Sequence, residues 1–550
     1  MLQYSQLKVP LGNTDIEGAL AQALKIKKTD ILTCSIAKKS VDARKELRKV
    51  YHVIFSLKKG VRFKKNGKVT RFQPPKNWEA YFREIGGKGV TDDDTTIVVG
   101  SGPAGLFCAY VLSLAGRKVC LIERGAPMKE RKKDVEDFFA TGVLNEESNI
   151  CFGEGGAGTF SDGKLNSMVK DKTGKKEFVL KTFHKFGAPD PILTDAKPHM
   201  GTDYLETVIS HMRKELEKQG VEVIFHGKVT DLLMEEDQVV GVQYQAGEET
   251  LQKKGKVVLA IGHSARDTFH MLAERKLILE PKGFAVGVRV AHKQEQVDRD
   301  RYHKTREEWE KETGELLSPA DYKLTARTSD GRGVYSFCMC PGGYVVASST
   351  EPGRLCINGM SDQKRDGKYA NSAIVVTVKD EDFKQMGKSG IFAGMEFQRE
   401  LEELAYLLGK GRIPAQFYPD FKRGVPSEKL PDFLEKEGCK GKIFPSNLKN
   451  ILPEPVWNGI IEGMEHFSHQ MPSFCQEDTV LFGTETRTSS PLRIVRDSSL
   501  QAKGFTGLYP CGEGAGYAGG IMSAALDGIK VAMAILGENE EEPDQIDKRK

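Results

Sequence analysis

Residues 95–123 read TTIVVGSGPAGLFCAYVLSLAGRKVCLIE, and this segment decides the fold. Its pattern predicts an apolar strand, a glycine turn, an apolar helix and a second strand. Gly100, Gly102 and Gly105 have the G-x-G-x-x-G spacing directly after the first strand. The first glycine allows a tight turn, the second lets the backbone approach a pyrophosphate, and the third lets the helix pack closely. We therefore predict a dinucleotide site whose turn also includes Ser101, Pro103 and Ala104.

An acidic residue completes this motif. Glu123 lies 18 residues after Gly105, at the end of the second strand. A carboxylate at this position can accept hydrogen bonds from the ribose hydroxyls of an adenosine and repels a 2′-phosphate. The helix N-terminus faces the phosphates with its positive dipole end. Arg124, which follows the acid, is a further expected cofactor contact.

A second glycine-rich segment lies near the other end of the chain, at residues 506–528, TGLYPCGEGAGYAGGIMSAALDG. A cofactor longer than the ADP half needs such distant contacts, because its ribityl chain and ring system extend beyond the first turn. A helix that starts near Ile521 would stabilise negative charge on a reduced flavin. The segment therefore indicates FAD rather than NAD. The contacts expected here are Gly512, Glu513, Gly519, Gly520 and Ile521.

A third segment, CFGEGGAGTFSDGKLN at residues 151–166, supplies small residues that fit beneath a cofactor. Polar side chains within it can contact the phosphates or the ring. The remaining expected cofactor contacts come from this segment and from two later strands: Gly155, Gly156, Gly158, Thr159, Lys164, Val229 and Gly262.

These motifs, with PHMGTDYL, LAIGHSARDT, FAVGVRV, FCMCPGG and ETRTSSPLRIVRD, resemble a family of bacterial FAD-dependent dehydrogenases. The resemblance covers almost everything from residue 95 to residue 535. It implies a glutathione-reductase-type FAD fold and FAD as cofactor, with no particular substrate. Relatives in that fold usually carry Asp where this chain has Glu513, which keeps the carboxylate but lengthens its reach.

The order of the predicted elements indicates an α/β protein. Short apolar strands alternate with helices, which is typical of a Rossmann-like FAD-binding domain. A less regular mixed α+β stretch interrupts it and is expected to be an inserted substrate or cap domain. The predicted parts are a small N-terminal α/β module (1–90), the FAD-binding domain (91–285 and 481–536), the cap (286–480) and a disordered tail (537–550).

Composition narrows the function classes. Lys and Arg number 81 against 77 Asp and Glu, so no global charge argues for nucleic acid. The chain has no apolar run long enough to span a membrane and no secretory signal, so we expect no membrane partner and a cytoplasmic location. Ten scattered cysteines favour reduced thiols. No metal site is expected.

Two absences bear on the electron donor. The sequence has no second G-x-G-x-x-G fingerprint, since Gly262 in LAIGHSA lacks the continuation, and no C-x-x-x-x-C pair near the first one. We therefore expect no embedded NAD(P)H domain. NAD(P)H remains an option as a transient donor that visits the flavin directly.

Lys164 and His263 are the expected catalytic residues. Lys164 directly follows the third glycine segment, and a cation near the ring favours anionic reduced flavin. His263 follows a strand end and is interpreted as an acid or base, or as a structural histidine. Arg266 could bind an anion, and His199 has no readable role.

Two further groups have alternative interpretations. Cys338 and Cys340 could be redox or metal residues, but alternation along a strand puts both on one face, where cysteine usually packs as a small apolar residue. A donor-rich set before the closing motif could line the flavin, clamp an anionic substrate or form a structural turn: Arg487, Thr488, Ser489, Ser490 and Arg493.

The sequence thus predicts an FAD-dependent dehydrogenase that transfers hydride between flavin N5 and a small-molecule substrate. One alternative is a flavin monooxygenase or an ene-type reductase. Another is a flavin-containing RNA- or protein-binding protein, to which the basic runs KKSVDARKELRK and LKKGVRFKKNGK of the N-terminal module would contribute. Oligomeric state is not readable from the sequence.

Overall fold

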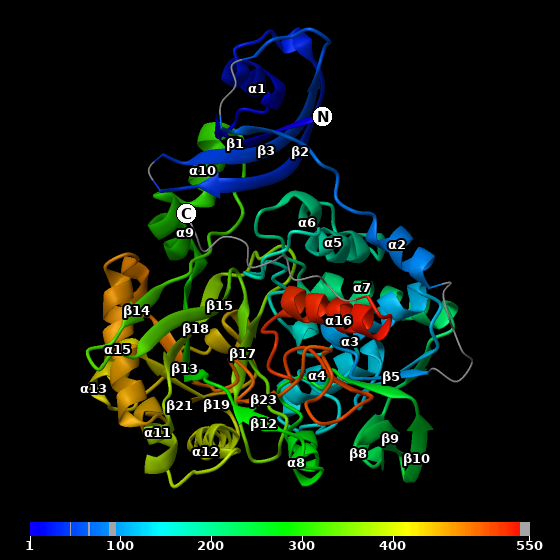
Figure 1. The fold of residues 1–550 in the computed structure, drawn as a ribbon. Helices are drawn as coiled ribbons and strands as arrows, with labels where there is room; N and C mark the ends of the chain where they lie inside the picture. Colours follow the sequence, from blue (N-terminus) through cyan, green and yellow to red (C-terminus); the bar gives the residue numbers. More distant parts are fainter. Residues whose placement is uncertain (45, 64–66, 87–94, 539–550) are drawn as a thin grey trace.

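The computed structural model describes residues 1–44, 46–63, 67–86 and 95–538. Figure 1 shows a small N-terminal module (blue) above two larger regions, one made of the cyan to green part of the chain with its red end and the other of the green to orange part. The domain boundary predicted at residues 90 and 91 and residues 539–550 of the predicted tail lie outside the described residues. No helix in the described part is long and apolar enough to cross a membrane.

The N-terminal module is an antiparallel sheet with the strand order β2-β3-β1-β4, and one helix packs on it. Val9, Leu20, Val53 and Phe55 are fully buried between sheet and helix. The Asp15 side chain caps the helix by accepting a hydrogen bond from the Gly18 N–H. The elements are β1 (Leu2–Pro10), α1 (Ile16–Leu24), a 3-10 turn (Lys28–Asp30), β2 (Ile31–Asp42), β3 (Arg48–Leu57) and β4 (Val69–Arg71).

A five-stranded parallel sheet with the order β24-β11-β5-β6-β7 forms the dinucleotide domain. Three of its strands are completely buried, as expected for a parallel sheet that helices cover. This confirms the predicted α/β class and Rossmann-like sheet. The strands are β5 (Thr96–Val99), β6 (Val119–Ile122), β7 (Glu222–Ile224), β11 (Lys256–Leu259) and β24 (Leu508–Pro510).

Two helices from opposite ends of the chain pack together on this sheet, as Figure 1 shows for α3 and α16. A Cβ added at Gly528 would lie 2.1 Å from the Ala104 carbonyl oxygen, so this glycine permits the close approach. The domain's helices are α3 (Pro103–Leu114), α4 (Met128–Thr141), a 3-10 turn (Ala157–Phe160), α5 (Lys175–Lys185), α6 (Pro191–Thr194), α7 (Thr202–Lys218), α8 (Arg266–Glu274) and α16 (Ile521–Ile535).

Helix α2 (Trp78–Ile85) differs from the predicted division of the chain. The sequence placed it in the N-terminal module, whereas Trp78 and Phe82 pack in the core of the dinucleotide domain. The helix exposes one polar face and buries its aromatic face, and this aromatic face contacts Phe178 of α5.

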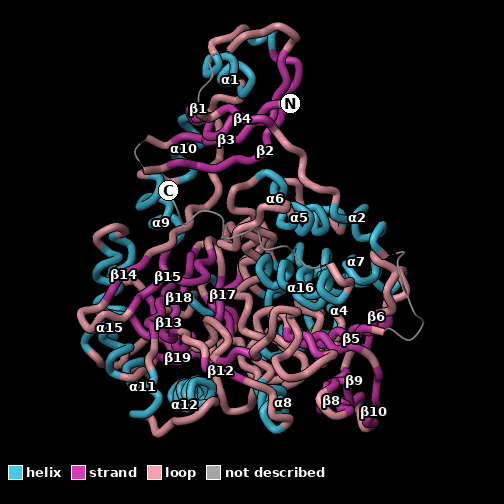
Figure 2. Tube along the Cα trace, viewed as in Figure 1, coloured by secondary structure: helices cyan, strands magenta, loops and turns pink. Residues whose placement is uncertain are grey.

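An antiparallel meander leaves the parallel sheet between β7 and β11 and is made of β8 (Gly227–Glu235), β9 (Gln238–Ala246) and β10 (Glu249–Lys254). Figure 2 shows these strands at the lower edge of the dinucleotide domain. Val229 on β8 faces the cofactor side of the domain, where it lines the main cavity.

The region inserted between β11 and β24 is built on a seven-stranded mixed sheet with the order β14-β15-β18-β13-β22-β19-β21. Its strand β22 begins at Val480, so this sheet crosses the boundary expected at residue 480. The strands are β13 (Ala285–Lys293), β14 (Thr325–Arg327), β15 (Gly333–Cys340), β18 (Tyr369–Thr377), β19 (Ile413–Phe417), β21 (Ile443–Pro445) and β22 (Val480–Glu485).

Helices pack around this sheet, with α12 and α15 the longest of the region. The helices are α9 (Gln294–Tyr302), α10 (Arg306–Thr313), α11 (Asp380–Gln385), α12 (Ala393–Leu408), α13 (Tyr418–Arg423), α14 (Leu434–Glu437) and α15 (Glu454–Ser468), with 3-10 turns at Leu448–Asn450 and Pro472–Cys475. Two small sheets join β12 (Leu279–Pro281) to β23 (Leu492–Ile494), and β16 (Tyr344–Ala347) to β17 (Ile357–Met360) and β20 (Cys439–Lys440).

Candidate functional site

A cavity of about 840 Å³ runs between the dinucleotide domain and the inserted region. Gly100 and Gly102 of the first turn line one part of it, and Cys338, Met339 and Glu485 of the large sheet line another. Residues far apart in the chain therefore share one cavity of a size that suits an extended cofactor with a substrate beside it.

The glycine turn leaves no room for a side chain at two of its glycines, Gly100 and Gly105. A Cβ at Gly105 would lie 1.9 Å from the Gly100 carbonyl oxygen. Gly100 itself has φ of 100°, and a Cβ there would meet the Ala260 carbonyl oxygen at 2.4 Å. A Cβ at Gly156 would meet the Cα of Gly102 at 2.9 Å, so the third glycine segment packs directly against the first.

Glu123 is buried and holds this turn together. Its carboxylate accepts hydrogen bonds from the Ser101 N–H and hydroxyl, both at 2.8 Å. It also accepts the Gly125 N–H at 3.0 Å and the Gly153 N–H at 2.9 Å. The acid lines the cavity, as a ribose ligand must, and at the same time joins three loops.

Charged groups surround Arg124 beside the acid. Arg124 forms ion pairs with Glu147 at 2.6 Å and Asp267 at 3.0 Å, and Lys228 pairs with the same two carboxylates. Burial acts to raise the pKa of Asp267, but the neighbouring Arg124 and Lys228 hold it at about 2. Arg124 also stacks over the Phe152 ring, 4.1 Å from its centroid, which leaves a flat, rigid wall at this end of the cavity.

The closing segment meets the loop after β11. Glu513 Oε1 lies 3.3 Å from His263 Nδ1, so the two candidate residues of these distant segments form one pair. A Cβ on Gly514 would clash with the Gly262 backbone at 2.4 Å, which explains the small residue there. Asp527 on α16 fixes the turn, because it accepts the Gly512 N–H at 2.8 Å.

Lys164 is a fixed cation. Its ammonium group donates to the Asp162 carboxylate and to the Met339 carbonyl oxygen. Burial, the largest influence, acts to lower its pKa, yet the charges of Asp162, Cys340 and Cys338 together raise it. Arg365 donates to the same Asp162 through Nε at 2.8 Å, so one buried carboxylate holds two cations in the cavity wall. Lys164 is therefore protonated and cannot serve as a base near neutral pH.

Arg266 and Arg487 meet on Glu402, a fully buried residue of α12. Each guanidinium binds this carboxylate with two hydrogen bonds between 2.8 and 3.0 Å. The charges of the two arginines hold the pKa of Glu402 far below its usual value despite burial. The interpretation of Arg266 as an anion-binding group is not supported, because its guanidinium already pairs with Glu402 and Glu351. Arg487 lines the cavity and also donates hydrogen bonds to the Ser264 and Thr350 hydroxyls.

Some residues of the donor-rich set 487–493 line the cavity and others form a structural turn. Thr488 lines the cavity and exchanges hydrogen bonds with the Ala285 backbone. Ser489 accepts a hydrogen bond from Lys282, a cavity residue, at 2.5 Å. Ser490 is buried and bonds to the Leu492 backbone, as the structural-turn interpretation predicts.

The structure places most of the predicted residues on the cavity. Those that line it are Gly100, Gly102, Pro103, Ala104, Glu123, Arg124, Gly156, Gly158, Lys164, Val229, Gly262, His263, Glu513, Gly519, Gly520 and Ile521. Ser101, Gly105, Gly155, Thr159 and Gly512 are next to the lining residues in sequence but do not themselves line the cavity. His199 is outside it, with Nε2 3.0 Å from the Gln363 carbonyl oxygen.

Sequence reasoning missed several cavity residues. Lys282, Arg365 and Glu485 line it, although none of them belongs to a glycine-rich segment. Arg289, fully buried on β13, supports the wall through a bidentate pair with Glu485 at 3.0 and 3.1 Å. A buried charged residue inside an apolar strand, as in FAVGVRV, was the one signal that could have marked it.

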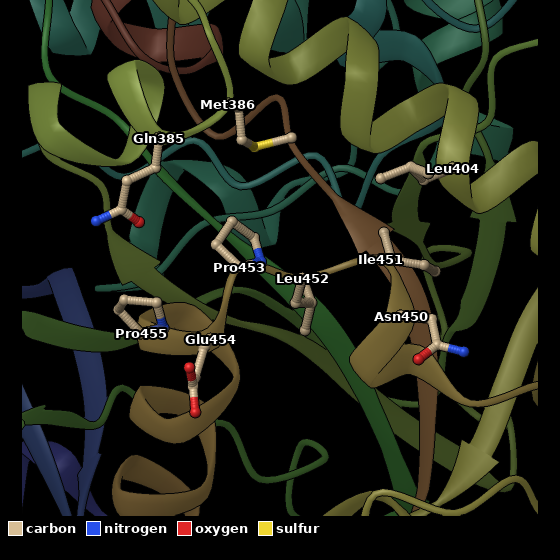
Figure 3. A pocket seen from close by; sticks show the side chains of 9 residues that line it. All are labelled: Gln385, Met386, Leu404, Asn450, Ile451, Leu452, Pro453, Glu454 and Pro455. Atoms are coloured by element: carbon tan, nitrogen blue, oxygen red, sulfur yellow. The ribbon is translucent and has the colours of Figure 1, made fainter.

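A second pocket, of about 410 Å³, lies at the start of α15. Figure 3 shows Leu404, Ile451 and Leu452 on its apolar side and Gln385 and Glu454 at its edge. None of its nine lining residues belongs to the main cavity, and no sequence motif points to it. Among the residues that the structure describes, no group of three or more His, Cys, Asp and Glu side chains could hold a metal ion.

The backbone around the glycine turns fits a dinucleotide. The helix α3 begins at Pro103 with no side-chain cap in the described structure, and α16 likewise begins at Ile521 with none. Both helices direct their N-terminal ends at the cavity, where anionic groups are favoured. The residues present therefore fit a cofactor with a pyrophosphate and a ring system.

Comparisons with known proteins agree with this fit. A model of NAD(P)-binding Rossmann-like domains matches residues 98–127. A model described as FAD-dependent protein, C-terminal domain-like, matches residues 283–488, and a domain of unknown function matches residues 1–56. The fold and the site define an FAD-dependent flavoprotein of the oxidoreductase type, and its cofactor is FAD.

A protein of Clostridium beijerinckii, described as "Uncharacterized protein", is similar to this chain along nearly its whole length. It is 41% identical over 538 residues, which are 95% of each chain. The present chain belongs to the same family of FAD-dependent proteins.

Solved structures match this chain at low similarity. They include the flavin-dependent brominase Bmp2 triple mutant (14% identity, 80% of this chain, 79% of that chain, TM-score 0.35). Glycine oxidase from Bacillus cereus has 12% identity over 82% of this chain and 96% of its own, with a TM-score of 0.31. A flavocytochrome c3 fumarate reductase has 12% identity over 85% and 82%, with a TM-score of 0.33. At such values they carry no argument about the reaction.

Proposed function

We propose that this protein is an FAD-dependent dehydrogenase that transfers hydride between flavin N5 and a small anionic substrate. The observation that carries the proposal is the continuous cavity, because the glycine turn and the wall with Lys164 and Cys338 belong to one space. Bound FAD would supply the hydride chemistry, and the chain would supply orientation and electrostatics.

The charge of the lining supports an anionic substrate. Eight Lys and Arg residues line the cavity against five Asp and Glu residues. Arg124 and Lys228 lie at the adenosine end, whereas Lys164 and Arg365 lie near the large sheet. Asp162 balances only one of the two cations at the second location, and the positive charge that remains would favour a substrate carboxylate or phosphate there.

We assign the proton-transfer role to His263 rather than to Lys164. The His263 side chain is mostly buried, lines the cavity and has Glu513 3.3 Å away to orient its ring. Lys164 would stabilise negative charge on the reduced ring, because the ion pair with Asp162 keeps its ammonium group protonated.

The test is anaerobic reduction of the purified holoprotein, followed by the absorbance band of the flavin. NADH, NADPH and a panel of small carboxylates and phosphates are added in turn. Bleaching by an organic acid and not by the nicotinamides supports the proposal. Rapid bleaching by NADPH followed by oxygen consumption would instead show a monooxygenase, and a band that no compound bleaches would overturn the proposal.

Variants separate the two roles. Lys164→Met should weaken substrate binding and make the flavin harder to reduce, whereas His263→Gln should lower the maximal reduction rate with less effect on binding. Lys170→Met, at an exposed position outside the cavity, is the matched control. Equal behaviour of all three variants would remove both residues from the mechanism.

A further inference from the structure

Cys338 lies at an unusual point of β15. Its backbone has φ of 46°, in the left-handed region that non-glycine residues rarely adopt. The register of β15 against β18 shifts between Phe337 and Cys340, so the simple alternation expected from the sequence fails here. Cys338 consequently lines the main cavity and is half-buried, whereas Cys340 is completely buried behind it.

The Cys340 thiol reaches back to Cys338. It donates a hydrogen bond to the Cys338 carbonyl oxygen at 3.2 Å. In an extended chain, residues two apart are separated by about 6.6 Å, which is at the upper end of the Cα separation of a disulfide. The positive φ of Cys338 and the register shift take this segment out of the extended geometry.

Two cations flank the pair. Arg289 Nη1 donates to the Cys338 carbonyl oxygen at 3.2 Å, and Lys164 donates to the carbonyl oxygen of Met339 between the two cysteines. The hydrogen bond from Cys340 lowers the pKa of Cys338 most; burial opposes it, and Lys164 and Arg289 lower it further, to about 6. The pKa of Cys340 is raised well above its usual value, first because its proton is held by Cys338 and then because of burial.

We propose that Cys338 and Cys340 are a reactive dithiol in which Cys338 attacks small anionic disulfides that enter the flavin cavity and Cys340 resolves the product. The excess of cations along the cavity indicates the anionic class of this substrate. The sequence left a redox interpretation of the two cysteines open, and the bulge, Lys164 and Arg289 supply the structural argument for it.

The chemistry balances without a further oxidant. The Cys338 thiolate attacks one sulfur of the disulfide R–S–S–R, forms a mixed disulfide and releases one R–S⁻. Cys340 then loses its proton and attacks the Cys338 sulfur, which forms the Cys338–Cys340 bond and releases the second R–S⁻. The two cysteines are oxidised by two electrons, and the substrate is reduced to two thiols. Excess thiol reverses both steps.

The first experiment treats the full-length holoprotein with oxidised glutathione and measures intact mass and free thiols. The expected product has lost two hydrogen atoms and two of its ten thiols, and peptide mapping finds Cys338 joined to Cys340. In Cys340→Ser the reaction stops at a glutathionyl group on Cys338, and in Cys338→Ser neither product forms. The control Cys439→Ser, which removes a buried cysteine outside the cavity, behaves as the parent protein.

A second measurement follows iodoacetamide alkylation of Cys338 against pH. We expect a midpoint near about 6 and, in Lys164→Gln, a midpoint at higher pH with slower alkylation at neutral pH. An unmodified Cys338 in Cys340→Ser, or alkylation of Cys338 no faster than that of the equally half-buried Cys34, would overturn the proposal. Both readouts are masses and thiol counts and involve no flavin turnover, so a failed dehydrogenase assay does not affect them.

Discussion

The two walls of the cavity are held in opposite ways. The dinucleotide wall is made of backbone, where Gly105, Gly100 and Gly156 leave no room for a Cβ and Glu123 accepts amide hydrogens. The wall from the inserted region is made of buried charges, such as Arg289 with Glu485 and the two arginines on Glu402. The glycine motif of the first wall can be recognised within six residues of sequence. The ion pair between Arg289 and Glu485 in the second wall joins residues that are 196 positions apart.

The largest loss of stability is expected from a variant that removes a buried charge from the wall of the inserted region. Glu402→Gln leaves Arg266 and Arg487 without their shared carboxylate in a fully buried position. Loss of one member of a buried ion pair costs about 3–5 kcal/mol. We expect that decrease in the free energy of unfolding, measured by urea denaturation of the holoprotein.

The neighbouring Glu403 provides the matched control on the same helix. Its side chain is 55% exposed and lies 3.5 Å from Arg354. Glu403→Gln should change stability by less than about 1 kcal/mol. Similar losses for the two variants would show that the inserted wall does not depend on its buried charges.

The backbone wall is tested by Gly105→Ala. The new Cβ would lie 1.9 Å from the Gly100 carbonyl oxygen, and neither backbone can move aside cheaply. Overpacking of this kind costs about 3 kcal/mol, and the turn that holds FAD is distorted directly. We expect loss of flavin on gel filtration and a lower melting temperature.

Gly283→Ala serves as its control, because a Cβ there has nothing within 4 Å and the residue lies outside the lining. It should retain FAD as the parent protein does. Retention of FAD by Gly105→Ala as well would mean that the turn relaxes more easily than its geometry implies.

These two walls explain what could be predicted from the sequence. The parallel sheet, the glycine turn, Glu123 and the pairing of two distant glycine segments follow from local spacing, apolar strands and helix ends. The module predicted at 1–90 includes helix α2, whose Trp78 and Phe82 pack in the core of the dinucleotide domain, because an apolar helix face does not show from the sequence which partner buries it.

The inserted region was described only as mixed α+β, and its chemistry was missed for a related reason. Arg289 and Glu485 look like isolated charges until a sheet brings their strands together. Alternation also failed at Cys338, where a bulge turns the side chain into the cavity. Register shifts of this kind depend on tertiary packing, which a single sequence does not display.

A pH effect is expected from the interior of the inserted region. His292 is buried on β13, where its Nε2 lies 3.0 Å from the Tyr322 hydroxyl, and burial lowers its pKa from 6.5 to about 4. Because the folded pKa is depressed, the stabilisation is complete above pH 6.5 and is lost as pH falls towards 4. We expect a decrease of about 2–3 kcal/mol in the free energy of unfolding across this window.

Denaturation at several pH values measures this effect. His292→Gln should remove most of the slope between pH 6.5 and 4, and His466→Gln, at an exposed position of α15, should leave it unchanged. An unchanged slope in His292→Gln would assign the pH dependence to carboxylates instead.

The smallest expected effect returns to the dinucleotide wall and tests whether a side chain contributes to it. Thr159 is buried, and its hydroxyl has no partner among the described residues, although the sequence marks it as a cofactor contact. If bound FAD satisfies this hydroxyl, Thr159→Val weakens FAD binding by about 1 kcal/mol and leaves the apoprotein as stable or slightly more stable. Thr159→Ser should restore the affinity, as measured by FAD titration of the apoprotein. Equal FAD affinity in all three proteins would show that this wall binds its cofactor through backbone alone, which would make the contrast between the two walls complete.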